Sequence, residues 1–363
     1  LDEFRTALDQ RALTSSTMYA DVEGNILYIH GSAVPARDSA EDWSAPVDGS
    51  SSATAWRGYH ALVDLPQILN PSSGWIRYTG AGGFDVSAPG DNPDSAAFPR
   101  YMSPLTDGSR VRAVRAVQAL RTARAARRLL AADAAWTLEE WAAAAFDAYV
   151  PAAEEAIPLL IAEWEQVGGT DPRRARLVDE AMDQLRAWDH VAEADSEAAT
   201  LFVLWQERLR SGGYEGDYAQ FRAMEDVVAA LERDWGSSTV AWGEINRLQR
   251  VRSNEGVVFS DQRESLPVPG APIWGGSIFT FNAQPVEGAA RRYGVSGTRW
   301  IAAAELGTDV RFRSIVPFGQ SADPRSAHWA DQAVLYARGE LKNALFRREE
   351  IMANARRVYR AVR

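Results

Sequence analysis

The spacing of apolar residues changes twice along the chain and predicts strands near both ends with helices between them. Residues 18–30 surround the turn-forming residues Glu23, Gly24 and Asn25, which favours two short strands joined by a turn. From about 107 to 235, apolar positions recur at helical spacing among many alanines. This pattern predicts helices at 151–167, 172–188, 196–211 and 217–235.

The last part of the chain returns to the strand pattern and then predicts a closing helix from about 339 to 362. Alternating or β-branched segments predict strands at 278–281, 293–296, 298–301 and 310–316. Strands on both sides of a helical middle indicate an α+β fold. We expect three parts: strands and loops at 1–106, helices at 107–236, and returning strands with the closing helix at 237–363.

The composition argues against two kinds of partner. The 363 residues include 49 acidic and 39 basic ones, a formal net charge of −10. Nucleic acids and anionic membranes require concentrated positive charge, so we expect neither as the main partner. Arg121, Arg124, Arg127 and Arg128 form one basic cluster, which is typical of a solvated helix face. No apolar run reaches the roughly 18 residues of a spanning helix, and no signal-peptide pattern follows Leu1, so we expect a soluble chain.

Several catalytic arrangements lack their residues. The chain has no cysteine, which excludes a thiol nucleophile, a thiolate metal site and a disulfide framework. Its one lysine, Lys342, falls on an expected exposed helix position rather than in a desolvated pocket. The histidines are far apart and form no zinc-binding pair: His30, His60, His190 and His328. With no nucleophile elbow or phosphate-binding loop either, any activity must use unusual groups or groups on another chain.

Short segments spread over nearly the whole chain carry a family resemblance. One is Tyr19-Ala20-Asp21-Val22-Glu23-Gly24-Asn25-Ile26. The others follow in order at 31–37, 56–59, 64–66, 70–76, 185–189, 241–247, 316–324 and 328–332. Together they resemble the penicillin acylase family of N-terminal nucleophile hydrolases, a group that includes acyl-homoserine-lactone acylases.

This resemblance implies a fold, a reaction and a companion chain. The family fold is a four-layer αββα sandwich, and the reaction removes an acyl group from an amide through an acyl-enzyme. Family precursors cut themselves, so that a serine becomes the first residue of the larger chain and its own α-amine acts as the base, with an unperturbed pKa of roughly 7.7–8.0. The first residue here is Leu1, and residues 1–5 resemble a helix well inside the family's large chain. We therefore expect either a companion chain that carries the serine or a partial or degenerate homologue.

The segment after Trp75 departs from the family pattern. Where the family usually has Gln-Asn-Cys-Asn, this chain has Arg77, Tyr78, Thr79 and Gly80. The resemblance places Gly80 at the asparagine whose side chain donates to the tetrahedral oxyanion, and losing such a donor typically costs ~3–4 kcal/mol of transition-state stabilisation. A replacement donor would be Tyr78, Arg77, Thr79 or a backbone amide of the glycine-rich stretch at 80–83. The alternative interpretation of these glycines is a flexible turn without a role in catalysis.

Other site residues follow from neighbouring positions. Trp56 and Trp75 flank the turn-rich region and are expected, with Arg77, to contact the substrate. Arg110 matches an arginine that the family places near its active site, and a helix-start salt bridge is the alternative role. Asp91 or Asp94 falls near the position of a carboxylate that holds a structural calcium in some family members, but both also suit a solvated turn. No cofactor is expected to be required.

Two hypotheses about function remain. The first is the larger part of an amide hydrolase acting on an N-acyl compound, such as a β-lactam antibiotic or an acyl-homoserine lactone, in the periplasm or outside the cell. This chain alone would then be inactive and would bind its companion through well over ~2,000 Å² of surface. The second, suggested by Gly80 and the absent serine, is a catalytically silent homologue that serves as a binding or interaction protein. The acyl chain and the leaving group stay unspecified.

Overall fold

The computed structural model describes residues 1–11, 13–43, 45–80, 82–102, 110–132, 135–252 and 259–358, with only the backbone of 110–116. The chain divides into two compact units. Unit 1 comprises Leu1–Ala135 with Leu306–Asp309, and unit 2 comprises Trp136–Glu305 with Val310–Arg363. The three-part division at 106 and 236 stays a prediction. Among the described residues, no helix is long and apolar enough to cross a membrane.

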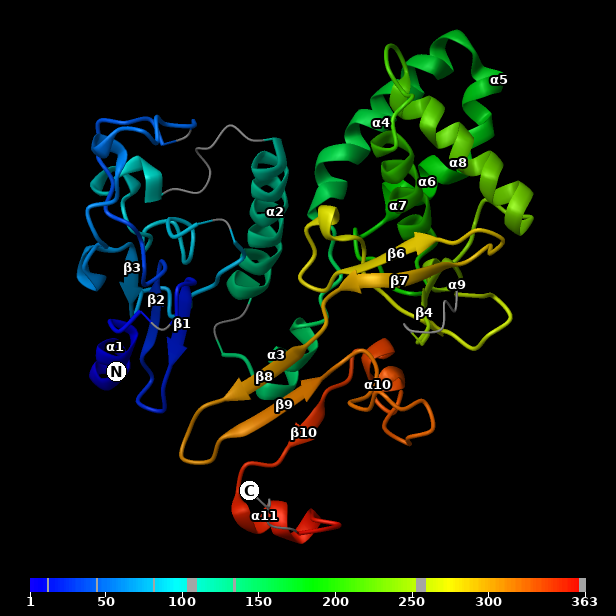
Figure 1. Cartoon of the computed structure of the whole chain (residues 1–363). Helices are drawn as coiled ribbons and strands as arrows, with labels where there is room; N and C mark the ends of the chain where they lie inside the picture. The colour runs from blue at the N-terminus through cyan, green and yellow to red at the C-terminus, as the bar shows by residue number, and fades with distance from the viewer. Residues whose placement is uncertain are drawn as a thin grey trace. The chain divides into compact units, whose positions relative to one another are not determined.

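Unit 1 is built on a small antiparallel sheet (Figure 1). The predicted hairpin is confirmed, because β1 (Thr17–Ala20) pairs with β2 (Ile26–Ile29), and β2 pairs in turn with β3 (Gln67–Leu69). Its helices are α1 (Asp2–Leu8) and α2 (Arg110–Ala132), and between β3 and α2 the described backbone is mostly irregular. The buried residues Leu8, Leu27, Ile29, Leu65 and Met102 form the core under this sheet.

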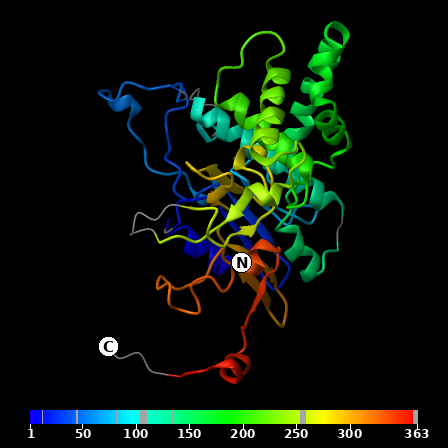
Figure 2. The ribbon, with the colours of Figure 1, turned by 90° about the vertical axis from the view of Figure 1, so that its right-hand side faces the viewer.

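Unit 2 begins with a run of helices, and those between residues 151 and 235 lie above its strands in both views (Figures 1 and 2). They are α3 (Leu138–Ala144), α4 (Pro151–Thr170), α5 (Pro172–Ala175), α6 (Asp179–Ala187), α7 (Glu197–Arg210), α8 (Ala219–Trp235) and α9 (Trp242–Ile245). Local signals set several ends: Thr137 and Glu140 form a capping box at α3, and Gly236, with φ +73°, ends α8. The large buried side chains Trp205, Phe202 and Phe221 belong to the core of these helices.

The strands of unit 2 form two further sheets. The first has the order β5-β4-β7-β6, from β4 (Asn246–Leu248), β5 (Leu266–Pro267), β6 (Phe281–Pro285) and β7 (Arg292–Gly297). In it β4 and β7 are parallel and the other pairs are antiparallel. The second, antiparallel throughout, has the order β10-β9-β8, from β8 (Ile301–Glu305), β9 (Arg311–Ile315) and β10 (Lys342–Ala344). With helices and sheets segregated in this way, the α+β expectation is confirmed.

The prediction of one helix over 339–362 is wrong. Gly339 has φ +71° and follows α10 (Ala333–Ala337), and the next helix, α11 (Arg348–Asn354), is short. Between them β10 pairs with β9, so that Lys342 lies opposite Ser314. Lys342 is thus a strand residue, because pairing with a distant strand outweighs the local helical pattern. Residues 359–362 of that expected helix lie outside the described residues.

The expected helix at 172–188 is also interrupted. A 3-10 turn at Arg176–Val178 separates α5 from α6, and Val178 leaves the helical region with φ −121° and ψ 7°. The other predicted helices differ from the structure by a few residues at their ends, as α4, α7 and α8 show.

Candidate functional site

The candidate site is the loop that follows β3, residues 70–92 of unit 1, called here the 70–92 loop. Asn70, with φ +49°, begins it and joins it to the β1–β2 hairpin, since its Oδ1 accepts from the amide of Ile26 at 2.8 Å. Gly74 then closes a turn on Pro71, with N to O at 3.0 Å and φ +76°. The 70–92 loop is therefore attached at its start to the strands that precede it.

A second set of bonds holds the two arms of the 70–92 loop together. The amide of Arg77 donates to the carbonyl of Val86 at 2.7 Å. Asn92 accepts from the amides of Val86 and Ser87 at 2.7 and 2.9 Å, and its Nδ2 donates back to Ser87 and Ala88 carbonyls. Because one side chain satisfies four backbone groups, Asn92 defines the conformation of this arm. Sequence reasoning did not select Asn92.

Arg77 lies inside the 70–92 loop. Its side chain is 5% exposed and forms an ion pair with Asp85, whose other oxygen lies 3.7 Å from Nη2 of Arg127 on α2. Burial lowers the pKa of the Arg77 guanidinium, while the bond to Asp85 acts in the opposite direction. Its Nε and Nη1 have no hydrogen-bond partner among the described residues. The geometry gives Arg77 a role in holding the loop, and its expected contact with substrate stays a prediction.

The next residues differ sharply in exposure. Tyr78 is 42% exposed, and its ring lies 5.6 Å from the buried ring of Tyr28. Thr79 is already engaged, because its hydroxyl donates to the carbonyl of Ala119 on α2 at 3.0 Å. Gly80 has φ +85°, and no heavy atom of the described residues, apart from those of its chain neighbours, lies within 4 Å of where its Cβ would be. Of the candidate donors with side chains, Tyr78 is the exposed one.

The far end of this turn packs against a half-buried histidine. A Cβ on Gly83 would lie 3.0 Å from Cβ of His30, so a larger residue would displace one of the two segments. The Nδ1 atom of His30 lies 3.3 Å from the hydroxyl of Tyr28, and burial lowers the pKa of the imidazole. His30 thus supports the turn in its neutral form.

The two expected tryptophans differ in exposure and in their contacts. Trp75 is half-buried, and its carbonyl accepts from the hydroxyl of Ser87 at 2.8 Å. Trp56 is 58% exposed, and its aromatic neighbour is Tyr59, with ring centroids 6.5 Å apart. Arg110 is the first residue of α2, and its side chain lies outside the described residues. Their roles as substrate contacts and as an active-site arginine stay predictions.

The two calcium candidates are engaged in local bonds. Asp91 accepts from the hydroxyl of Ser72 at 2.6 Å and from the amide of Ser73 at 2.8 Å. These serines lower the pKa of Asp91 from its usual 3.8 to about 2. Asp94 caps a 3-10 turn by accepting from the amide of Ala96 at 2.9 Å. The described residues contain no group of three or more acidic or histidine side chains arranged for a metal, so they do not by themselves supply the six to eight oxygens of a calcium site.

Comparisons with known proteins cover the chain in full or in part. The family model of penicillin amidase matches residues 1–353. Penicillin G acylase of Escherichia coli is 42% identical over 67 residues, which are 18% of this chain and 8% of that protein. The structure of a thermostable penicillin G acylase from Alcaligenes faecalis superposes with a TM-score of 0.58 at 16% identity, covering 100% of this chain and 70% of that one.

Proposed function

The chain belongs to the penicillin amidase family, and on this premise we propose that it forms part of an amide hydrolase that removes an acyl group from an N-acyl compound. The match over residues 1–353 is the observation that carries the proposal. The α+β architecture, similar to that of a penicillin G acylase, supports it. Because the sequence match spans only 8% of the E. coli acylase, the activity, substrate and partner of the whole protein belong to the proposal.

The proposed nucleophile is the hydroxyl of an N-terminal serine on a companion chain. Its oxygen attacks the amide carbon while the α-amine takes the hydroxyl proton, and an oxyanion forms. The C–N bond then breaks, the amine leaves with that proton, and water hydrolyses the resulting ester to a carboxylic acid. This chain's part in the mechanism is the 70–92 loop, which would face the oxyanion.

Within that loop, Tyr78 is the proposed oxyanion donor. Its side chain is 42% exposed, whereas Thr79 donates to a helix carbonyl and Arg77 is buried against Asp85. A backbone amide near Gly80 is the other available group. Arg77 and Asp85 would act as positioning residues, since a fixed donor needs no reorganisation as charge develops.

The companion chain would also contribute the rest of the substrate pocket. We propose that it comes from the same precursor and that the assembly acts in the periplasm on a small N-acyl substrate such as a β-lactam antibiotic or an acyl-homoserine lactone. The family resemblance supports the partner and the compartment. A structural calcium near Asp91 or Asp94 stays a prediction.

The test is to produce the chain together with the segment encoded directly upstream of it. The purified assembly is incubated with N-acyl substrates, and the released primary amine is measured. Amine release that disappears when the companion's first serine is replaced by alanine would support the proposal. If the coding sequence supplies no segment beginning with Ser, Thr or Cys, or if the purified chain alone turns over substrate, the two-chain serine mechanism is wrong.

A second candidate function rests on Gly80. Glycine has no side chain with which to donate to an oxyanion, so the family scaffold would then serve as a binding or interaction protein without catalysis. The same assembly separates the two functions. Retained binding of an N-acyl compound, with no amine release by an assembly that contains the serine, would favour the silent homologue.

A further inference from the structure

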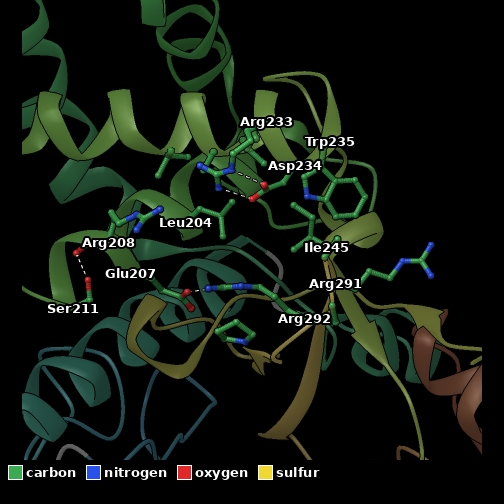
Figure 3. Close-up of a pocket in the computed structure, with 17 residues that line it drawn as sticks. Leu204, Glu207, Arg208, Ser211, Arg233, Asp234, Trp235, Ile245, Arg291 and Arg292 are labelled. Atoms are coloured by element: carbon green, nitrogen blue, oxygen red, sulfur yellow. Dashed lines mark hydrogen bonds and ion pairs between the residues drawn. The ribbon is translucent and has the colours of Figure 1, made fainter. Parts of the chain in front are cut away.

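A pocket of about 960 Å³ lies in unit 2, between α7, α8 and the turn that joins β6 to β7 (Figure 3). This volume falls within the range of small-molecule sites in proteins. None of its lining residues belongs to the 70–92 loop, so the pocket consists of other residues than the candidate acylase site. The proposed function gives it no task.

The floor of the pocket is apolar. Val227 and Leu231, one turn apart on α8, and Ile245 at the end of α9 are each 2% exposed. Leu204 of α7 adds a half-buried side chain, and the indole of Trp235 borders the same space. The partly exposed Leu204 and Trp235 offer an apolar ligand body a contact surface, and the three buried side chains complete the apolar lining.

The rim, in contrast, is charged, and two of its arginines are neutralised. Arg292 reaches toward Glu207 and forms an ion pair with it (Figure 3). Arg233 bonds both oxygens of its neighbour Asp234, at 2.7 and 2.8 Å. Neither pair contributes net charge to the pocket.

The other two arginines leave an excess of positive charge. Arg291 points away from the Arg292–Glu207 pair, and its Nη2 lies 3.8 Å from Glu244, a residue outside the lining (Figure 3). Arg208 forms no ion pair with any carboxylate in the part of the chain that the structure describes. It lies one helical turn from Leu204 on α7, so a free guanidinium and an apolar side chain line the same face.

We propose that this pocket binds an amphipathic monocarboxylate, with its carboxylate on Arg208 and its hydrocarbon body against Leu204, Val227, Leu231 and Ile245. One unpaired arginine matches one negative charge, and the planar guanidinium can hold a carboxylate through two parallel hydrogen bonds. Because the floor is apolar, an acid with a hydrocarbon chain should bind more tightly than a simple oxyanion such as phosphate.

Binding of octanoate tests the proposal without any catalytic turnover. Octanoate, its neutral analogue octanamide, acetate and inorganic phosphate are titrated separately into the complete protein by isothermal calorimetry. Octanoate should bind at least ~10-fold more tightly than each of the other three, since both the charge and the hydrocarbon are required.

Two variants and one control locate the site. Arg208→Gln should weaken octanoate binding about 10-fold, and Arg208 is exposed, so this change leaves the fold intact. Ala230→Trp, which fills the pocket from α8, should abolish binding. Arg173→Gln removes an exposed arginine of α5 outside the pocket and should bind octanoate like the wild type. Circular dichroism melts verify that each variant is folded.

Three results would overturn the assignment. If octanamide binds as tightly as octanoate, Arg208 does not recognise the carboxylate. If phosphate or acetate binds as tightly as octanoate, the apolar floor does not contribute to affinity. Unchanged octanoate affinity in Arg208→Gln would place the ligand elsewhere, including at the candidate acylase site. Because no step depends on hydrolysis, a failed amidase assay leaves this test intact.

Discussion

Replacing Gly80 with asparagine returns to the 70–92 loop the side chain that the family resemblance places there. The structure allows it, because the Cβ position is open to 4 Å. The backbone cost is set by φ +85°, a left-handed conformation that costs most side chains about 1–2 kcal/mol but that asparagine adopts more readily than others. Against a typical total stability of about 5–15 kcal/mol, the variant should stay folded.

The expected gain is in the chemical step. An added side-chain amide aimed at the oxyanion is worth about 2.7–4 kcal/mol, or 10²–10³ in kcat. We therefore expect Gly80→Asn to raise kcat for amide hydrolysis by about two orders of magnitude in the complete assembly, measured as amine release at saturating substrate. Chemical denaturation should show a loss of stability of no more than about 1 kcal/mol.

Gly74→Asn is the matched control. Gly74 lies in the same loop with φ +76° and equally open space, so its replacement carries a similar backbone cost without placing an amide at the aligned position. It should lose the same stability and gain no rate. If the two variants have the same kcat, the loop does not contact the reacting carbonyl, and the alignment of Gly80 with the oxyanion position is refuted.

Three further changes test the loop around Gly80. Asp85→Asn leaves the buried Arg77 without its counter-charge and should lower the free energy of unfolding in urea by about 3–5 kcal/mol. Arg127→Ala is the control, because it breaks the 3.7 Å contact with Asp85 and should change that free energy by less than ~1 kcal/mol. Equal losses of stability in the two variants would contradict this reasoning. The pKa of Asp91 is lowered from 3.8 to about 2 by two serines, so its stabilising effect is complete above pH 4 and is lost as the pH falls toward 2. Asp91→Asn should flatten the stability profile in that window, and an unaltered profile would show that another group titrates there. If the phenol donates to the oxyanion, Tyr78→Phe should cost about 2–4 kcal/mol of transition-state binding, measured as a decrease in kcat/KM. Unchanged kinetics would indicate that a backbone amide is the donor.

Local chemistry determined much of this protein from the sequence alone. The turn at Glu23–Asn25 fixes the β1–β2 hairpin, and the capping box at Thr137 fixes the start of α3, because the bonds involved join residues close together in the chain. Helices α4, α7 and α8 followed from apolar spacing. The short segments between residues 19 and 332 that resemble the penicillin acylase family were enough to indicate that family, and the match over residues 1–353 confirms it.

Tertiary structure decided what depends on distant partners. Residues 342–344 have a pattern that also suits a helix, and their pairing with β9 makes them a strand. The counter-charge of the buried Arg77 is Asp85, eight residues away, whose other oxygen lies 3.7 Å from Arg127 on α2. In the same way, the pocket beside Arg208 exists only because the turn between β6 and β7 meets α7 and α8. Side-chain spacing in one segment specifies its own helix or turn, whereas burial, charge pairing and pocket shape are properties of segments that meet only in the folded chain.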